Sequence, residues 1–295
     1  MRVVVTGATG FLGAVVSELL RERGHEVVCV GLSRAGRGTR KLDITNASAC
    51  AAMMEETRPR ATVHLAAIAN PDLCERDRQR ARRINIDGTS NLVHTAPKGI
   101  HFVLASTDYV FDGEGPPYDE ESPKSPINVY GRTKSEAEEV VEAETDDHLI
   151  LRLPVLYSAA PARPGRFVEA AIRAVNSQKI IELDDWQMQC PTLAQDVARA
   201  LELLVTSEQR GCFHISAREA TTKFQFAMKT AEWLGLSAAH LVPGKPKSTA
   251  STLVARPRDC RMETGKFAAV GGFEFRSYLA VIPQLLQDMG LRAQT

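Results

Sequence analysis

The sequence lacks a net charge, because its 36 lysines and arginines balance its 36 aspartates and glutamates. A balanced chain has no overall attraction for polyanions, which argues against a general binder of nucleic acid or of an anionic membrane surface. It also lacks an apolar signal-peptide segment, and no apolar stretch approaches the roughly 20 residues that a membrane-spanning helix needs. We therefore expect a cytoplasmic protein with neither nucleic acid nor membrane as a partner.

The sequence is equally poor in features of a metal site or a disulfide scaffold. Six cysteines are scattered over 295 residues without a Cys-x-x-Cys pair, and the histidines follow no ligand spacing. In a chain long enough to build its own core, such cysteines are typical of buried thiols in a reducing compartment. We predict no metal ligand.

What the sequence does contain is a regular alternation of short apolar runs and helical patterns in its first half. Such alternation predicts parallel strands in a doubly wound, Rossmann-type α/β sheet. The predicted strands are 2–6, 26–30, 61–66, 101–105 and 148–153. Helices are predicted at 47–57, at 76–95 and from Ser125-Pro126 to about Glu144, with the acidic run 136–144 as a solvated face.

After Pro154 the pattern loosens. Helices are predicted at 167–176, 193–205 and 221–234, strands at 180–183 and 211–215, and a Pro/Gly/Lys/Ser-rich loop at 243–252. We therefore predict a Rossmann domain over 1–154 and a smaller lobe over 155–295. Parts of the lobe near 191–216 are expected to return and pack on the first body.

Three glycines stand between the first strand and the first helix, at G-x-x-G-x-x-G spacing. A tight turn there lets the backbone approach a pyrophosphate, which the free N–H groups and dipole of the helix stabilise. An ordinary strand-to-helix turn is the alternative. The place of the glycines at the first turn of a βαβ unit favours a dinucleotide site, formed by Gly7, Thr9, Gly10, Phe11, Leu12 and Gly13.

The end of the second strand indicates which dinucleotide. An acidic residue there would bind the ribose 2′-OH of NAD, but no acid occurs before Asp43. Arg34 offers instead a guanidinium suited to the 2′-phosphate of NADP, with a solvated basic loop as the alternative. Asp43 and Ile44 are expected beside the adenine, although a helix N-cap at Asp43 is an alternative.

Tyr130 and Lys134 are four residues apart, so on a helix they share one face. A neighbouring ammonium would lower the pKa of the phenol from about 10 and make Tyr130 a usable general acid or base. The string Ser106-Thr107-Asp108-Tyr109 follows a predicted strand. A hydroxyl there can hydrogen-bond a substrate carbonyl held beside Tyr130.

These motifs together resemble an extended short-chain dehydrogenase/reductase. The strings 64–67 and 85–89 add to that resemblance. The strings 106–113 and 126–131 are similar to those of dTDP-4-dehydrorhamnose reductases and of the related regulatory β-subunit of methionine adenosyltransferase. The similarity continues through 190–192, 256–259 and 262–266, and so covers nearly the whole chain.

The resemblance implies roles for individual residues. Thr107 would polarise the carbonyl, Tyr130 would donate the proton, and Lys134 would hold the nicotinamide ribose. Asn85 would support the helix or a proton relay through water. The resemblance also places residues against the cofactor or the substrate: Leu65, Ala66, Ala67, Pro154 and Val155 by the cofactor, and Asp108, Tyr109 and Trp186 by the substrate, with a core position as the alternative for Trp186.

The leading hypothesis is an NADPH-dependent reductase of a keto group. We expect its substrate to be a nucleotide-linked 4-keto sugar. An epimerase or dehydratase with tightly held NAD is a competitor, but it would favour an acid at the end of the second strand. The second alternative is an NADP-binding regulatory subunit that works through a partner protein. The basic loop after the second strand and the string Asp185-Trp186-Gln187 look closer to that regulatory subunit. A homodimer is compatible with either function.

Overall fold

A single parallel sheet organises the larger part of the molecule. The structure is a computed structural model, and it describes residues 1–32, 38–245 and 254–291. Seven strands lie in the order β10-β6-β5-β4-β1-β2-β3, and every neighbouring pair is parallel. Their bounds are β1 (Arg2–Thr6), β2 (Glu26–Gly31), β3 (Arg40–Lys41), β4 (Ala61–His64), β5 (His101–Thr107), β6 (His148–Leu153) and β10 (Gly211–His214). The carboxyl ends of all seven strands therefore meet at one edge.

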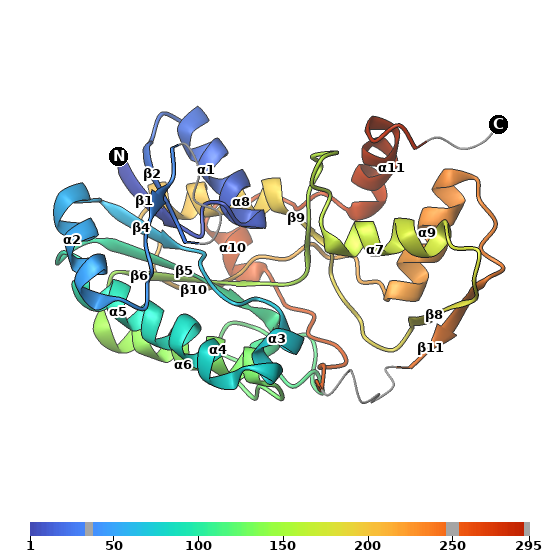
Figure 1. Cartoon of the computed structure of the whole chain (residues 1–295), viewed down its shortest axis with the longest axis horizontal. Coiled ribbons are helices and arrows are strands. Elements are labelled where there is room, and N and C mark those ends of the chain that lie inside the picture. The colour runs from blue at the N-terminus through green and yellow to red at the C-terminus, as the bar shows by residue number, and fades with distance from the viewer. Residues whose placement is uncertain (33–37, 246–253, 292–295) are drawn as a thin grey trace.

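Helices cover both faces of this sheet (Figure 1). One face packs against α1 (Phe11–Glu22), α8 (Ala194–Thr206) and α10 (Gly265–Ala269), and the other against α2 (Ala47–Thr57), α5 (Gly88–Thr95) and α6 (Val129–Glu144). Alternate strand residues point to opposite faces of the sheet. Val3 and Val5 pack with α1 and α8, and Val4 packs with α2, α5 and α6. Burial on both sides explains why the strands read as continuous apolar runs.

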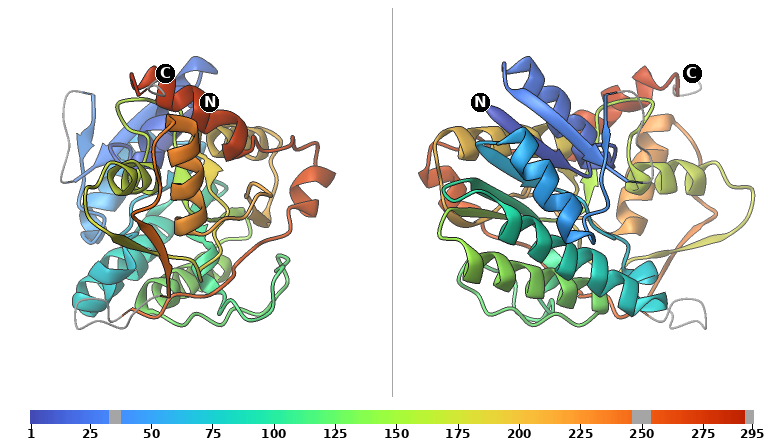
Figure 2. Two further views of the ribbon diagram at one scale, coloured as in Figure 1. Left: turned by 90° about the vertical axis from the view of Figure 1, so that its right-hand side faces the viewer. Right: turned by 60° about the vertical axis from the view of Figure 1, so that its left-hand side comes forward.

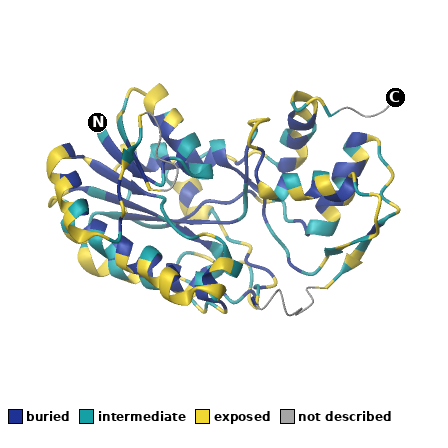
Figure 3. Cartoon of the chain, in the orientation of Figure 1, coloured by how far each residue is buried: buried dark blue, intermediate teal, exposed yellow. Residues whose placement is uncertain are grey.

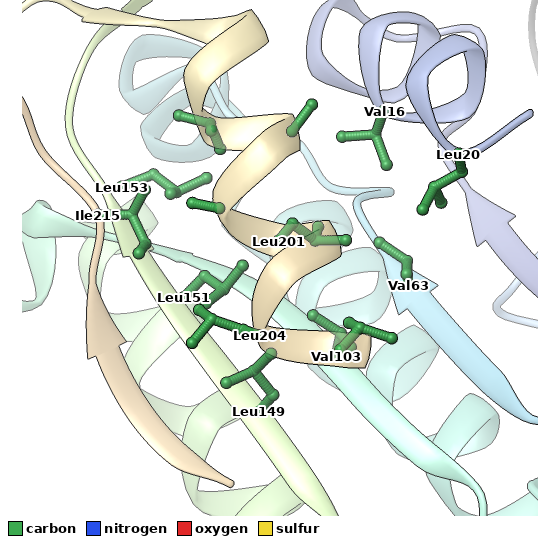
Figure 4. Close-up of a cluster of buried hydrophobic side chains, with 14 of the residues drawn as sticks. Val16, Leu20, Val63, Val103, Leu149, Leu151, Leu153, Leu201, Leu204 and Ile215 are labelled. Carbon is green, nitrogen blue, oxygen red and sulfur yellow. The ribbon is translucent and has the colours of Figure 1, made fainter. Parts of the chain in front are cut away.

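The core between α1, α8 and the strands is shown in Figure 4. Leu201 and Leu204 of α8 point toward Val103 of β5 and Leu149 of β6, and all four side chains are fully buried. Figure 3 shows the buried strands at the centre and the exposed outer faces of the helices. Segments 194–206 and 211–214 thus belong to the core of the first body, although they follow it in the sequence.

A second, smaller group of elements lies beyond the carboxyl edge, at the right of Figure 1 and in both views of Figure 2. It contains α7 (Arg166–Val175), α9 (Lys223–Leu234) and α11 (Tyr278–Asp288), with β8 (Ile181–Asp184) paired to β11 (Leu241–Gly244). These helices share a second apolar cluster around Phe226 and Ile282. The short strands β7 (Leu156–Tyr157) and β9 (Thr192–Leu193) pair between the two groups.

The predicted strands of the first half are confirmed, and the two-residue strand β3 was not predicted. The single helix predicted over 76–95 is wrong. The chain instead forms α3 (Pro71–Arg76), α4 (Arg78–Arg82), a π-helical turn (Arg83–Asp87) and α5. The interruption arises because the Asp77 side chain accepts a hydrogen bond from the Arg80 N–H at 2.9 Å, which starts a new helix.

The predicted helix start at Ser125-Pro126 is also wrong. Helix α6 begins at Val129, because the Asn128 side chain caps it by accepting from the Gly131 N–H at 2.8 Å. Nor is the acidic run of this helix solvated throughout, since Glu138 is fully buried against Arg152 of β6. Within the described residues, no helix is both long and apolar enough to cross a membrane. The same residues contain no cluster of three or more His, Cys, Asp or Glu placed to hold a metal ion.

The core position of α8 gives a test of this architecture. Leu201→Ala should lower the free energy of unfolding by about 2–5 kcal/mol, because it leaves a cavity between α8 and the sheet. Urea denaturation followed by circular dichroism measures the loss. Leu279→Ala makes the same change at a side chain that is 44% exposed and should cost no more than about 0.5 kcal/mol. Equal losses in the two variants would contradict the packing of α8 described above.

Candidate active site

The candidate site lies at the carboxyl edge of the sheet, where the chain leaves each strand. The glycine turn follows β1, Thr107 ends β5, and Pro154 and Val155 follow β6. Helix α6 begins beside the end of β5 and brings Tyr130 and Lys134 to the same place. In open parallel sheets this edge is where ligands bind.

The turn between β1 and α1 leaves no room for a side chain at its glycine positions. A Cβ on Gly13 would lie 2.1 Å from the carbonyl oxygen of Gly7, and one on Gly7 would lie 2.8 Å from the Ala66 nitrogen. Gly7 also has a φ of +66°, and Gly10 caps α1 without a side-chain hydrogen bond. The first N–H groups of α1 therefore face a glycine cradle, which is the arrangement that binds a pyrophosphate.

Asp43 and Ile44 lie after β3. In the sheet, β3 is two strands from β1, the strand that the glycine turn follows. The Asp43 carboxylate accepts hydrogen bonds from the N–H and hydroxyl of Thr45, and these two bonds lower its pKa. Asp43 is not the N-cap of the next helix, because Asn46 caps α2 by accepting from the Ala49 N–H. Arg34 lies outside the described residues.

Asn85 connects the end of β4 to helix α6. Its side chain is 1% exposed, accepts from the Ile68 N–H at 2.8 Å and donates to the Thr133 hydroxyl at 3.0 Å. Thr133 directly precedes Lys134. The bond from Asn85 therefore holds α6 in place next to that lysine. Leu65, Ala66 and Ala67 lie between β4 and Ile68, in the same exit segment.

The structure brings Thr107 and Tyr130 together, and Lys134 follows Tyr130 by one turn of α6. The Thr107 hydroxyl donates to Asp108 at 3.1 Å and accepts from the Tyr109 N–H at 3.2 Å, and it lies close enough to Tyr130 to influence the pKa of that phenol. The rings of Tyr109 and Tyr130 meet edge to face at 6.0 Å. Thr107 and Lys134 are both buried.

The protonation of this group differs from the expectation that Lys134 lowers the pKa of Tyr130. Burial is the largest influence and raises the pKa of Tyr130, a hydrogen bond with Thr107 lowers it, and the charge of Asp108 raises it. Burial lowers the pKa of Lys134 to about 8 and raises that of Asp108 to about 7. The Tyr130 phenol therefore keeps its proton at neutral pH, as a proton donor must.

A buried histidine that sequence reasoning did not single out lies behind Lys134. The Nδ1 of His64 is 2.7 Å from the Thr6 hydroxyl, and its Nε2 is 3.0 Å from the Thr89 hydroxyl. Burial and the charge of Lys134 lower the pKa of His64 to about 3. His64 is therefore neutral and joins β1, β4 and α5 without adding charge to the site.

The second group of elements reaches the site through Gln187. Its side-chain amide donates to the Tyr109 hydroxyl at 2.9 Å, and Gln187 itself is buried. The neighbouring Trp186 is partly exposed rather than a core residue, and it lines an open cavity of about 430 Å³ with Gly113 and Arg258. The sequence pointed to Gln187 only as a member of the substrate-loop string around Trp186, and its contact with Tyr109 was not predicted.

A second cavity, of about 230 Å³, lies against Val155. Its apolar lining includes Phe167 and Phe226, and its two cationic residues are Arg166 and Lys223. Burial lowers the pKa of Lys223. Neither cation was predicted, because each stands alone at the start of a helix without a motif around it.

Comparison with known proteins assigns the family. A family model described as the RmlD substrate binding domain matches residues 1–291. The chain is 34% identical over 284 residues to methionine adenosyltransferase 2 subunit beta of Bos taurus, covering 92% of this chain and 82% of that protein.

Two solved structures, both of dTDP-4-dehydrorhamnose reductases, share the fold. The one from Clostridium acetobutylicum has a TM-score of 0.86 at 26% identity, covering 98% of this chain and 100% of that one. The one from Bacillus anthracis, in complex with NADP, has a TM-score of 0.84 at 27% identity, covering 97% and 98%. With its parallel sheet and its match over residues 1–291, the chain belongs to the RmlD substrate-binding-domain family of extended short-chain dehydrogenases/reductases.

Proposed function

We propose that the chain is an NADPH-dependent reductase of a keto group, and that its substrate is a nucleotide-linked 4-keto sugar. The observation that carries this proposal is the meeting of Thr107, Tyr130 and Lys134 at the carboxyl edge, beside the glycine cradle. The similarity to dTDP-4-dehydrorhamnose reductases supports the substrate class.

The residues present fit NADP. The glycine cradle suits a pyrophosphate, and the similar reductase of Bacillus anthracis is in complex with NADP. When bound, NADPH supplies a hydride to the carbonyl carbon. The proposed contacts are Gly7, Thr9, Gly10, Phe11, Leu12 and Gly13 for the pyrophosphate, Arg34 for the 2′-phosphate, Asp43 and Ile44 for the adenine, and Leu65, Ala66, Ala67, Asn85, Tyr130, Lys134, Pro154 and Val155 toward the nicotinamide end.

The chain's own residues would handle the carbonyl oxygen. The Thr107 hydroxyl, which donates to Asp108 in this structure, would turn to donate to that oxygen, and the Tyr130 phenol would transfer its proton to it. The Lys134 ammonium stabilises the phenolate that remains and holds the ribose. Because Thr107 and Lys134 are buried, these groups act in a site of low dielectric, where preoriented dipoles and charges are most effective.

The two groups of elements would divide the work. Residues 1–154 would hold the cofactor and the lobe 155–295 the substrate, apart from α8 and β10, which pack on the first body, and Asp108 and Tyr109 would lie on one side of the sugar. The cavity beside Val155 offers phenylalanine rings together with Arg166 and Lys223, which suits a ligand with a planar base and an anionic group. Trp186 lines the other cavity, and we place it against the substrate as well.

A second candidate function is that of an NADP-binding regulatory subunit. The observation that favours it is the 34% identity to methionine adenosyltransferase 2 subunit beta over 92% of the chain. The two functions separate in one experiment, in which NADPH oxidation is followed against a panel of nucleotide-linked 4-keto sugars. A regulatory subunit binds NADPH, turns over none of these sugars and co-purifies with a partner enzyme.

The glycine cradle can be tested directly. Gly13→Ala places a methyl group where only 2.1 Å separates it from the Gly7 oxygen, so α1 must shift away from β1. Affinity for NADPH, measured by calorimetry, should fall at least about tenfold, which corresponds to ~1.4 kcal/mol. Gly265→Ala is the control, because nothing lies within 4 Å of its added Cβ. Unchanged affinity in Gly13→Ala would contradict the proposed pyrophosphate site.

Cofactor choice is expected to depend on Arg34. Arg34→Ala should weaken NADPH binding by roughly 1.5–3 kcal/mol, the range for hydrogen bonds to charged groups, and leave NADH binding nearly unchanged. Arg23→Ala removes an exposed guanidinium elsewhere and should affect neither cofactor. A wild-type preference for NADH would show that the basic loop does not bind the 2′-phosphate.

The proton donor is tested with Tyr130→Phe, which keeps the ring and removes the hydroxyl. Turnover of a keto sugar should fall by roughly 10²–10⁴, while NADPH affinity is nearly retained. Lys134→Met should reduce both quantities, because the ammonium is proposed to hold the ribose as well. Tyr278→Phe in α11 is the matched control and should change neither. Wild-type turnover in Tyr130→Phe would rule out this mechanism.

A further inference from the structure

A buried carboxylate lies one helical turn beyond Lys134. Glu138 of α6 is 0% exposed, and with Tyr130 and Lys134 it forms a row of residues four apart on one face of the helix. A buried charge is tolerated only when it is paired and hydrogen-bonded. Its partners therefore show what Glu138 is attached to.

The partners of Glu138 come from two adjacent strands. Arg152 of β6 donates from Nε to Oε1 at 3.2 Å and from Nη2 to Oε2 at 2.9 Å, and the Ser106 hydroxyl of β5 also donates to Oε1. Ser106 and Arg152 are paired neighbours in the β5–β6 register. The Nζ of Lys124 lies 3.4 Å from Oε2. The carboxylate thus joins α6 to both strands at one level of the sheet.

That level is adjacent to the proposed reacting groups. Ser106 immediately precedes Thr107, and Lys134 stands one turn before Glu138. A shift of α6 along β5 would have to break the bonds of Glu138 to Ser106 and Arg152. Glu138 therefore fixes the distance between the Thr107 hydroxyl on the strand and the Tyr130 phenol and Lys134 ammonium on the helix.

Glu138 also acts on Lys134 by its charge. Burial lowers the pKa of Lys134 to about 8, and the charge of Glu138 opposes that effect. From β4, His64 faces Lys134 but is neutral. Around Glu138, burial lowers the pKa of His214 to about 4 and raises that of Cys212 to about 12, so both are neutral at pH 7. The charged groups in this region are then Lys124, Lys134, Glu138 and Arg152, and at its edge Glu120, Glu139 and Glu142.

We propose that Glu138 is a positioning residue of the reductase site: its carboxylate ties α6 to β5 and β6 and keeps Lys134 in the ammonium form that binds ribose and stabilises the Tyr130 phenolate. This inference rests on the proposed function for its effect on turnover. Its effect on Lys134 can be measured without any substrate.

The test is Glu138→Gln, which keeps the size of the side chain and removes its charge. Lysines carrying ¹³C at Cε are titrated by NMR, and the Lys134 signal is assigned by its loss in Lys134→Met. The Lys134 midpoint should fall by about one pH unit, the lower end of the effect of a nearby opposite charge. Because the ammonium is the active form, the alkaline decline of turnover should begin about one unit lower as well.

Two variants separate this role from a general loss of stability. Glu142→Gln makes the same change at an exposed position one turn further along α6. It should leave the Lys134 midpoint and the pH at which turnover declines at their wild-type values. Glu138→Asp retains the charge and should return the Lys134 midpoint toward that of the wild type. If Glu138→Gln alone does not fold, the pair Glu138→Gln with Arg152→Gln leaves no lone charge and is titrated instead, with Arg152→Gln as its reference so that only the charge of Glu138 differs.

An unchanged Lys134 midpoint in the folded Glu138→Gln or paired variant would overturn the proposal, as would an equal shift in Glu142→Gln. A wild type that turns over no keto sugar would refute the proposed function and leave the lysine titration to decide the role of Glu138. A shifted midpoint with an unshifted pH profile of turnover would show that Lys134 is not the group that limits the reaction.

Discussion

The attachment of helix α6 to the end of strand β5 is the constraint on which the site depends. Three contacts hold it along its length. Near its start, Gly131 packs so closely that a Cβ there would lie 2.1 Å from the carbonyl oxygen of Tyr109. Further along, Asn85 bonds to Thr133, and Glu138 bonds to Arg152 and Ser106. Tyr130 directly precedes the first of these contacts and Lys134 lies between the second and the third, so their positions relative to Thr107 follow from the packing of the helix.

The sequence was sufficient to predict the features that depend on local pattern. The buried strands were found because parallel strands covered on both faces consist of apolar residues throughout. The glycine turn and the pair Tyr130 and Lys134 were found because each reflects a spacing along one element. The break near Asp77 was missed because it depends on one side-chain cap within a run of good helix formers.

The burial of Glu138 was missed for a different reason. Its spacing of four from Lys134 places it on the same face of the helix, but its partner Arg152 is on β6, beyond the end of the helix, so the acidic run alone does not show that Glu138 is buried and paired. The same holds for Gln187, whose partner Tyr109 is far away in the sequence. Contacts between side chains of distant elements determine the electrostatics of the site, and periodicity within one element contains no information about them.

The place of β10 at the edge of the sheet has a consequence for how the protein is made. Strand β6 pairs with β10, and α8 covers the apolar face that β5 and β6 share. A ribosome that has released only the residues up to the end of β6 has therefore produced a sheet with an open edge and a bare apolar face. Such surfaces are the ones by which unfinished chains associate with one another. The nascent chain stays exposed to that hazard until about sixty further residues, through His214, have emerged.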